Sequence, residues 1–165
     1  MDGRQQREDG HEGHRDELSK ARSKVARILG SMKVPASLDH LDAVLDFVHE
    51  ELEKRGCPVA TQAKIDIALE ELFVNVCNYA YSDQDEPGDV QVDYVDDDDI
   101  NAISVRLIDQ GVAFDPLVRA DPTRPESIED TNVGGLGIFM TKKLMDDITY
   151  LRDRGSNIVA FRKSW

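Results

Sequence analysis

Cysteine is scarce in this sequence, with two residues, Cys57 and Cys77, among 165. Two cysteines build neither a disulfide framework nor the ligand spacing of a structural zinc site. Cys57 precedes a proline in an expected loop, and Cys77 lies in an apolar helical run where a thiol behaves as part of the core. This usage is typical of a reducing compartment, and we expect the protein in the cytoplasm.

Long apolar segments are missing as well. No stretch provides the roughly 20 apolar residues that span a bilayer. The N-terminus lacks the apolar core of a signal peptide. We therefore expect neither a membrane protein nor a secreted one.

Basic side chains are few compared with acidic ones, 20 against 33, which gives a formal net charge of -13. Binding to nucleic acid without sequence preference requires Lys and Arg to replace the counterions along the phosphates, and an anionic membrane surface requires the same charge. The composition therefore argues against both partners. Part of the acid is concentrated in a run at 96–99, so the net charge does not describe any single site.

The chain is long enough to form one domain with a substantial core. Hydrophobic residues make up 40% and charged residues 32% of it, a mixture typical of soluble globular proteins. We expect residues 1–31 to be an N-terminal extension that is disordered or partly helical over 18–29, because its start is polar and mixed in charge. Residues 32–165 are expected to form the folded domain.

Hydrophobic periodicity predicts the helices and strands of the folded region. Apolar side chains recur at helical spacing over 38–55 and 61–81, and Gly56 and Pro58 separate the two segments. The predicted elements are an edge strand at 33–36, helices at 38–55, 61–81 and 134–146, and strands at 90–94, 103–108, 148–152 and 157–162. No period is visible over 113–133, and such a stretch inside a compact domain is typical of a functional lid.

One side of the helix predicted over 61–81 carries a carboxylate and two amides. Glu71, Asn75 and Asn78 stand at i, i+4 and i+7, which places them within about 60° of one another on a helix. Mg²⁺ prefers oxygen ligands and keeps several waters, so one Asn oxygen together with phosphate oxygens suffices to hold it. A carboxylate nearby can orient or deprotonate a nucleophile. A solvated polar stripe on an amphipathic helix is the alternative.

Two further segments place glycines beside predicted strands and helices. Asp109 ends the strand at 103–108, and Gly111 follows it, so a carboxylate at the floor of a pocket is available to accept from an exocyclic amine such as that of adenine. A common Asp-x-Gly turn is the alternative. The segment 134–137 holds three glycines before a helix, and exposed N–H groups at a helix N-terminus bind anions. A hinge or close packing is the alternative there, and no Gly-Lys-Ser/Thr follows to make a Walker loop.

The order and spacing of these three segments resemble the GHKL ATPases, and most closely their anti-sigma-factor serine/threonine kinase branch. The N box of that family matches 71–81, the first glycine box matches 109–116 and the second matches 134–137. The resemblance extends over about 33–164. It implies an α+β two-layer sandwich, the Bergerat ATP-binding fold, with a mixed, mostly antiparallel sheet that carries helices on one face. The implied cofactors are ATP and Mg²⁺.

The resemblance also implies roles for individual residues. Asn75 would coordinate Mg²⁺, Glu71 would be the general base that activates a protein serine hydroxyl, and Asp109 would bind the adenine amino group. The other positions expected to contact the nucleotide are Asn78, Gly111, Ala113, Phe114, Gly134, Gly135, Leu136 and Gly137, with a lid over 116–133. Ala113 stands where the first glycine box often has a second glycine, and Tyr79 stands where many relatives have His.

Three functions are consistent with this pattern. The first is a kinase that phosphorylates a STAS-type antagonist protein and sequesters a sigma factor when free, which the presence of Glu71 favours. The second is a regulatory module that binds ATP and a partner with negligible turnover. The third, a detached nucleotide-binding domain of a sensory histidine kinase, is disfavoured because the sequence shows no phosphoacceptor helix. Members of the branch commonly dimerise, so we also expect a homodimer.

Overall fold

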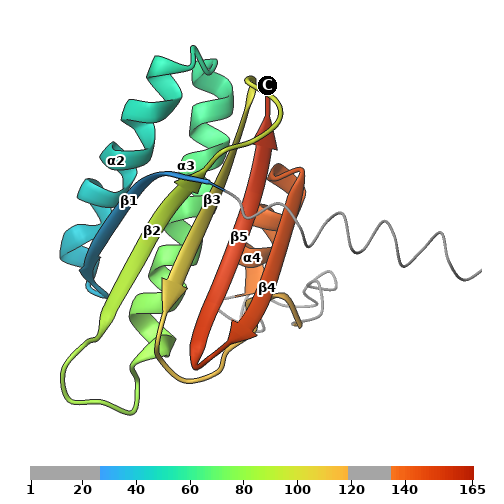
Figure 1. Cartoon of the computed structure of the whole chain (residues 1–165). Coiled ribbons are helices and arrows are strands. Elements are labelled where there is room, and N and C mark those ends of the chain that lie inside the picture. The colour runs from blue at the N-terminus through green and yellow to red at the C-terminus, as the bar shows by residue number, and fades with distance from the viewer. Residues whose placement is uncertain (1–26, 119–134) are drawn as a thin grey trace, which may run out of the picture.

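The computed structural model describes residues 27–118 and 135–165. They contain one five-stranded sheet with the strand order β1-β2-β3-β5-β4 (Figure 1). The strands are β1 (Ile28–Pro35), β2 (Asp89–Val95), β3 (Ala102–Asp109), β4 (Asp147–Asp153) and β5 (Ser156–Ser164). Outside the described residues lie 1–26, which make up most of the expected extension, and 119–134, which include Gly134 and most of the expected lid.

Every pair of neighbouring strands in this sheet is antiparallel. β4 runs in the same direction as β3, but β5 lies between them and is hydrogen-bonded to both. The two parallel strands therefore never pair with each other. The described sheet is antiparallel throughout, whereas the resemblance implied a mixed one.

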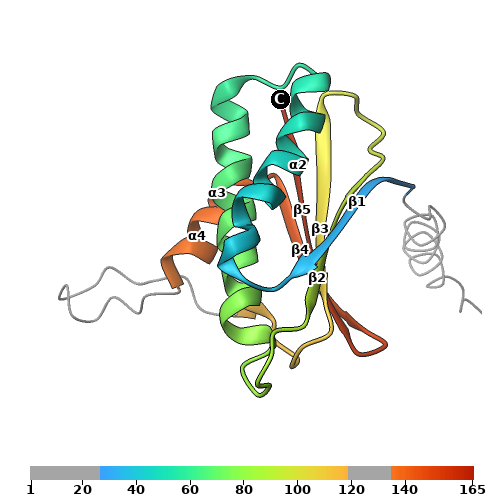
Figure 2. The same cartoon turned by 90° about the vertical axis from the view of Figure 1, so that its left-hand side faces the viewer.

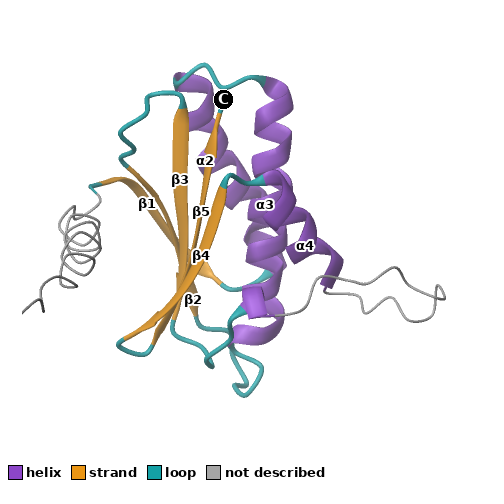
Figure 3. Ribbon diagram, turned by 90° about the vertical axis from the view of Figure 1, so that its right-hand side faces the viewer, coloured by secondary structure: helices purple, strands orange, loops and turns teal. Residues whose placement is uncertain are grey.

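Three α-helices cover one face of the sheet, namely α2 (Leu41–Lys54), α3 (Val59–Asn75) and α4 (Gly135–Leu144). Figures 2 and 3 show the helices on one side and the strands on the other. Three short turns complete the described structure: 3-10 turns η1 (Leu38–His40) and η3 (Pro116–Val118), and a π-helical turn η2 (Val76–Ala80). The predicted α+β sandwich with helices on one face is confirmed.

The core lies between the sheet and the helical layer. Inward-facing residues alternate along the central strands, so Val90 and Val92 of β2 and Val105 and Leu107 of β3 are buried. The buried side of α3 consists of Ile65, Ala68, Leu69, Leu72 and Phe73. This packing holds α3 across the sheet and fixes the position of its C-terminal turns. No helix in the described parts of the chain combines the length and the apolar character that crossing a membrane requires.

Several element boundaries differ from the sequence prediction, among them the starts of β1 and α3. β1 begins at Ile28, before the edge strand expected at 33–36, and it includes the end of the helix expected over 18–29. Pairing with β2 along almost the whole of β1 satisfies the backbone there, which local polarity does not reveal. α3 begins at Val59, directly after Pro58, whose missing N–H costs nothing at the start of a helix.

Candidate functional site

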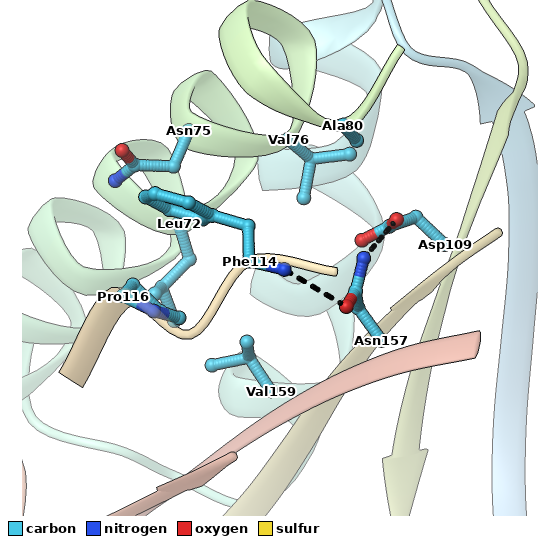
Figure 4. Close-up of a pocket in the computed structure, with 9 residues that line it drawn as sticks. All are labelled: Leu72, Asn75, Val76, Ala80, Asp109, Phe114, Pro116, Asn157 and Val159. Atoms are coloured by element: carbon cyan, nitrogen blue, oxygen red, sulfur yellow. Dashed lines mark hydrogen bonds between the residues drawn. The ribbon is translucent and has the colours of Figure 1, made fainter. Parts of the chain in front are cut away.

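A pocket that is partly open to solvent lies between the C-terminal turns of α3 and the end of β3 (Figure 4). The residues that line it are Leu72, Asn75, Val76, Ala80, Asp109, Phe114, Pro116, Asn157 and Val159. Three residues predicted from the sequence, Asn75, Asp109 and Phe114, are therefore brought together in one pocket. Most of the remaining walls are apolar, which suits the faces of a planar heterocycle.

Asp109 is the buried carboxylate of this pocket, with 5% of the residue exposed. Its Oδ1 accepts hydrogen bonds from the backbone N–H of Gly111 at 2.9 Å and from Nδ2 of Asn157 at 2.8 Å. Its Oδ2 has no hydrogen-bond partner among the described residues. Because most of the walls around it are apolar, this acceptor oxygen favours a ligand that brings a hydrogen-bond donor, such as an exocyclic amine.

Asn157 is a site residue that the sequence analysis missed. It pairs with Asp109 in the β3–β5 register and is buried, with 3% exposed. The inward-facing positions of β5 are otherwise Val159 and Phe161. An amide in an alternating series of buried apolar residues was the signal that could have identified it.

The segment after β3 is held against the helical layer by a close backbone approach. A Cβ on Gly111 would overlap the backbone carbonyl of Ala80, so no larger residue fits there without a shift of the main chain. The N–H of Val112 donates to the same carbonyl at 2.8 Å, and Nη1 of Arg152 donates to the Gly111 carbonyl at 3.0 Å. Glycine at this position is thus required by packing, and its predicted contact with a nucleotide remains a prediction.

Ala113 and Phe114 follow in the same segment with different surroundings. Ala113 is exposed and does not line the pocket. Phe114 lines it, and its ring stacks on that of Tyr79 with the centroids 5.2 Å apart. The aromatic pair extends the apolar wall of the pocket outward.

Asn75 and Glu71 lie on consecutive turns of α3. Nδ2 of Asn75 donates to the backbone carbonyl of Glu71 at 2.7 Å, which leaves the amide oxygen without a hydrogen-bond partner among the described residues. Burial, with a smaller contribution from the neighbouring charge of Glu70, raises the pKa of the Glu71 carboxyl above its ordinary value. Two oxygens are therefore available at this end of the site, one from an amide and one from a carboxylate that ionises less readily than usual.

Asn78 does not join this pair. It is exposed and is absent from the pocket lining. It lies in η2, where the π-helical turn contains more residues than an α-helical one, so the alignment calculated for an ideal helix does not hold. Its predicted contact with a nucleotide remains a prediction.

The second glycine segment lies against Glu71. Gly135 begins α4, which packs beside α3, and Gly134 lies outside the described residues. A Cβ on Gly137 would overlap the Glu71 carboxylate, so this glycine gives the carboxylate its space. Leu136, by contrast, is 54% exposed. The first turn of α4 thus adjoins the Glu71 carboxylate, and the free N–H groups of a helix N-terminus attract anions.

Comparison with protein-family models agrees with this geometry. Residues 34–163 match the model of the histidine kinase-like ATPase domain. That match extends from the end of β1 to β5 and so includes most of the described structure. The chain therefore belongs to the histidine kinase-like ATPase domain family.

Curated relatives of similar sequence carry the name serine-protein kinase RsbW. One from Listeria monocytogenes serotype 4a is 32% identical over 99 residues, which cover 58% of this chain and 61% of the relative. The chain thus spans less than two thirds of that relative. Another from Staphylococcus epidermidis is 27% identical over 131 residues, covering 77% of this chain and 81% of the relative.

Solved structures share the fold at low sequence identity. A chain in the structure of the SiaB–SiaC complex from Pseudomonas aeruginosa is a neighbour with a TM-score of 0.58 at 14% identity, covering 92% of this chain and 99% of that one. The structure of the RsbU and RsbW domains of Rv1364c from Mycobacterium tuberculosis gives a TM-score of 0.56, also at 14% identity, covering 82% of this chain and 32% of that one. Both similarities support the antiparallel α+β architecture.

Proposed function

We propose that this chain binds ATP with Mg²⁺ and phosphorylates a serine or threonine of a STAS-type antagonist protein. In this role it would act in the cytoplasm as an anti-sigma factor that sequesters a sigma factor when free, and it would work as a homodimer. The observation that carries the proposal is a pocket with a buried acceptor at Asp109, together with a carboxylate of raised pKa at Glu71, one helical turn from the lining residue Asn75. Membership in an ATPase domain family and relatives named as serine kinases support it.

The chain's own residues fit a nucleotide with its metal ion. The amide oxygen of Asn75 is the type of ligand that Mg²⁺ takes, and its amide nitrogen is already bound to the helix backbone. Mg²⁺ would supply charge neutralisation on the phosphate oxygens. The N–H groups at the start of α4 would donate to the phosphates, and Asp109 Oδ2 would accept from the adenine amine.

Glu71 would act as the general base in this proposal. The hydroxyl oxygen of the substrate serine attacks the γ-phosphorus while its proton passes to the Glu71 carboxylate. The bond from the γ-phosphorus to the β–γ bridging oxygen breaks, and ADP leaves with that oxygen. A raised pKa favours this role because a base works best when its pKa lies nearer the operating pH.

The partner assignment rests on the relatives and not on the site. The neighbour from P. aeruginosa was solved as the SiaB–SiaC complex, so a chain of this fold binds another protein. The relatives named RsbW are called serine-protein kinases, which implies a protein substrate. We infer from these names that the acceptor here is a protein hydroxyl, and from the resemblance that it belongs to a STAS-type antagonist.

The test is phosphoryl transfer from γ-labelled ATP to the STAS-domain proteins of the source genome. We expect transfer by the wild type, and a loss of about 10²–10⁴-fold in Glu71→Gln with binding of Mg·ATP retained, because the base is removed and the pocket is not. Glu53→Gln on α2 is the matched control, since Glu53 is exposed and far from the pocket lining. Binding without transfer in the wild type would point to a regulatory module, and transfer unaffected by Glu71→Gln would remove Glu71 from the mechanism.

A further inference from the structure

Asn157 connects the segment 109–114 to strand β4 through all of its amide atoms. Its Nδ2 donates to Asp109 Oδ1 and to the Val112 carbonyl, both at 2.8 Å. Its Oδ1 accepts from the Tyr150 hydroxyl at 2.8 Å and from the backbone N–H of Phe114 at 3.4 Å. An amide has two N–H donors and two acceptor lone pairs, so Asn157 has no group left for a ligand. Asn157 can therefore influence a bound ligand only through the residues to which it is hydrogen-bonded.

These bonds fix which end of the amide faces Asp109. The Phe114 N–H only donates, and the Tyr150 hydroxyl directs its proton to the same oxygen, so Oδ1 of Asn157 points away from the carboxylate. The NH₂ group then faces Asp109. With the amide reversed, its oxygen would meet Asp109 Oδ1, and two acceptors would stand in contact without a proton between them.

The carboxylate of Asp109 is fixed in turn. Without Asn157, the Gly111 N–H would be the remaining donor to this carboxylate among the described residues. With Asn157, two donors hold the same oxygen, so rotation of the carboxylate would break both bonds. Oδ2 is therefore kept as the oxygen without a partner, in a pocket that Asp109 itself lines.

We propose that Asn157 and Tyr150 are positioning residues that determine which purine the pocket accepts, by holding Asp109 so that a lone acceptor oxygen faces the base. Such an oxygen accepts from the 6-amino group of adenine and opposes the 6-oxo group of hypoxanthine, which is itself an acceptor. The inference rests on the proposed function, because it assumes that this pocket holds the base of ATP. It assigns to the β4–β5 hairpin a role in specificity that the sequence motifs do not contain.

The experiment compares the affinities of the intact chain for Mg·ATP and Mg·ITP, by calorimetry, in the wild type and in Asp109→Asn, Tyr150→Phe and Asn157→Ala. We expect a wild-type preference for ATP of about 100-fold, which Asp109→Asn abolishes or reverses because its amide can donate to a 6-oxo group. Tyr150→Phe should reduce the preference by about threefold to tenfold, the effect of one hydrogen bond, and Asn157→Ala by about tenfold or more.

Tyr94→Phe is the matched control for the loss of a phenolic hydroxyl. Tyr94 lies on β2 and its ring packs against Phe47 of α2, away from the pocket lining. We expect this variant to keep the wild-type preference. Thermal melting of every variant separates a change in selectivity from a loss of folding.

Two failures are distinguishable. If Asp109→Asn leaves both affinities unchanged, the base does not sit at Asp109, and the proposed function fails together with this inference. If Asp109→Asn abolishes the preference but folded Tyr150→Phe and Asn157→Ala retain it, the positioning role is overturned while the ATP site stands. A lower melting temperature with an unchanged ATP-to-ITP ratio also counts against the inference, because stability alone is then what Asn157 and Tyr150 supply.

Discussion

The two ends of the candidate site differ in how completely their polar atoms are bonded. At the end around Asp109, where we propose that the nucleobase binds (the base end), Asp109 and Asn157 form a connected set of hydrogen bonds with one carboxylate oxygen left over. At the end around Glu71, where we propose that the phosphates bind (the phosphate end), the Asn75 amide oxygen and the Glu71 carboxylate have no hydrogen-bond partner among the described residues. The first end is organised before any ligand arrives, whereas the second leaves its oxygens for a ligand to satisfy.

This difference agrees with the separate tasks of recognition and chemistry. A base is distinguished by a few fixed atoms, so recognition gains from side chains that cannot rotate. Phosphoryl transfer needs oxygens that accept a proton or hold a metal ion, and these must not be occupied beforehand. Burial without a compensating bond costs stability, and a functional site accepts such a cost where its chemistry requires it.

Gly111 and Gly137, one at each end of the site, differ in the same way in how tightly they are packed. Gly111 meets the main chain of Ala80, which cannot move without disturbing the helix end. Gly137 meets the end of the Glu71 side chain, which can rotate away. One added methyl group should therefore affect folding at the base end and activity at the phosphate end.

The largest effect is expected for Gly111→Ala. The new Cβ overlaps the Ala80 carbonyl, and the Val112 N–H bond to that carbonyl is lost if the segment shifts. We expect a loss of about 3 kcal/mol or more in the free energy of unfolding, measured by urea denaturation. A variant as stable as the wild type would show that the base end is less rigid than the hydrogen bonds indicate.

Gly137→Ala is the counterpart at the phosphate end. Its methyl group displaces the Glu71 carboxylate, and misplacing a catalytic group by about 1 Å can cost 100-fold in rate. We expect phosphoryl transfer to fall by about that factor. Stability should change by less than about 1 kcal/mol, because alanine is also the better helix former. Transfer assays and urea denaturation on the same samples check both parts, and a stability loss equal to that of Gly111→Ala would remove the contrast between the two ends.

The fold and part of the site were predictable from local patterns. Helix and strand periodicity predicted the main helices and strands. The sequence motifs identified Asn75 and Asp109, which line the same pocket in the structure. Asn157 was missed because its role depends on pairing with Asp109 across the β3–β5 register, which is a long-range contact. Asn78 was placed with the functional face because an ideal helix was assumed, whereas the chain forms a π-helical turn there. Spacing within one element is readable from sequence, but register between elements is fixed by packing.

The smallest effect concerns the pH dependence of stability at the phosphate end. Burial raises the pKa of Glu71 above the ordinary value of 4.5, so the carboxyl is harder to ionise in the folded chain than in the unfolded one. Between the two pKa values the folded state holds more protons, and stability therefore falls as the pH rises through this window. Glu71→Gln removes the free-energy cost of ionising this partly buried carboxyl. We therefore expect the variant to be more stable than the wild type at pH 7, with the difference vanishing below about pH 4.5. Because water screens a half-buried group, the gain should stay below about 1 kcal/mol.

Urea midpoints across this pH range for Glu71→Gln, with Glu53→Gln as the exposed control, measure this gain in stability. A gain of equal size in both variants would trace it to net charge, and a Glu71→Gln variant less stable at pH 7 would mean that the carboxylate is held by a partner after all.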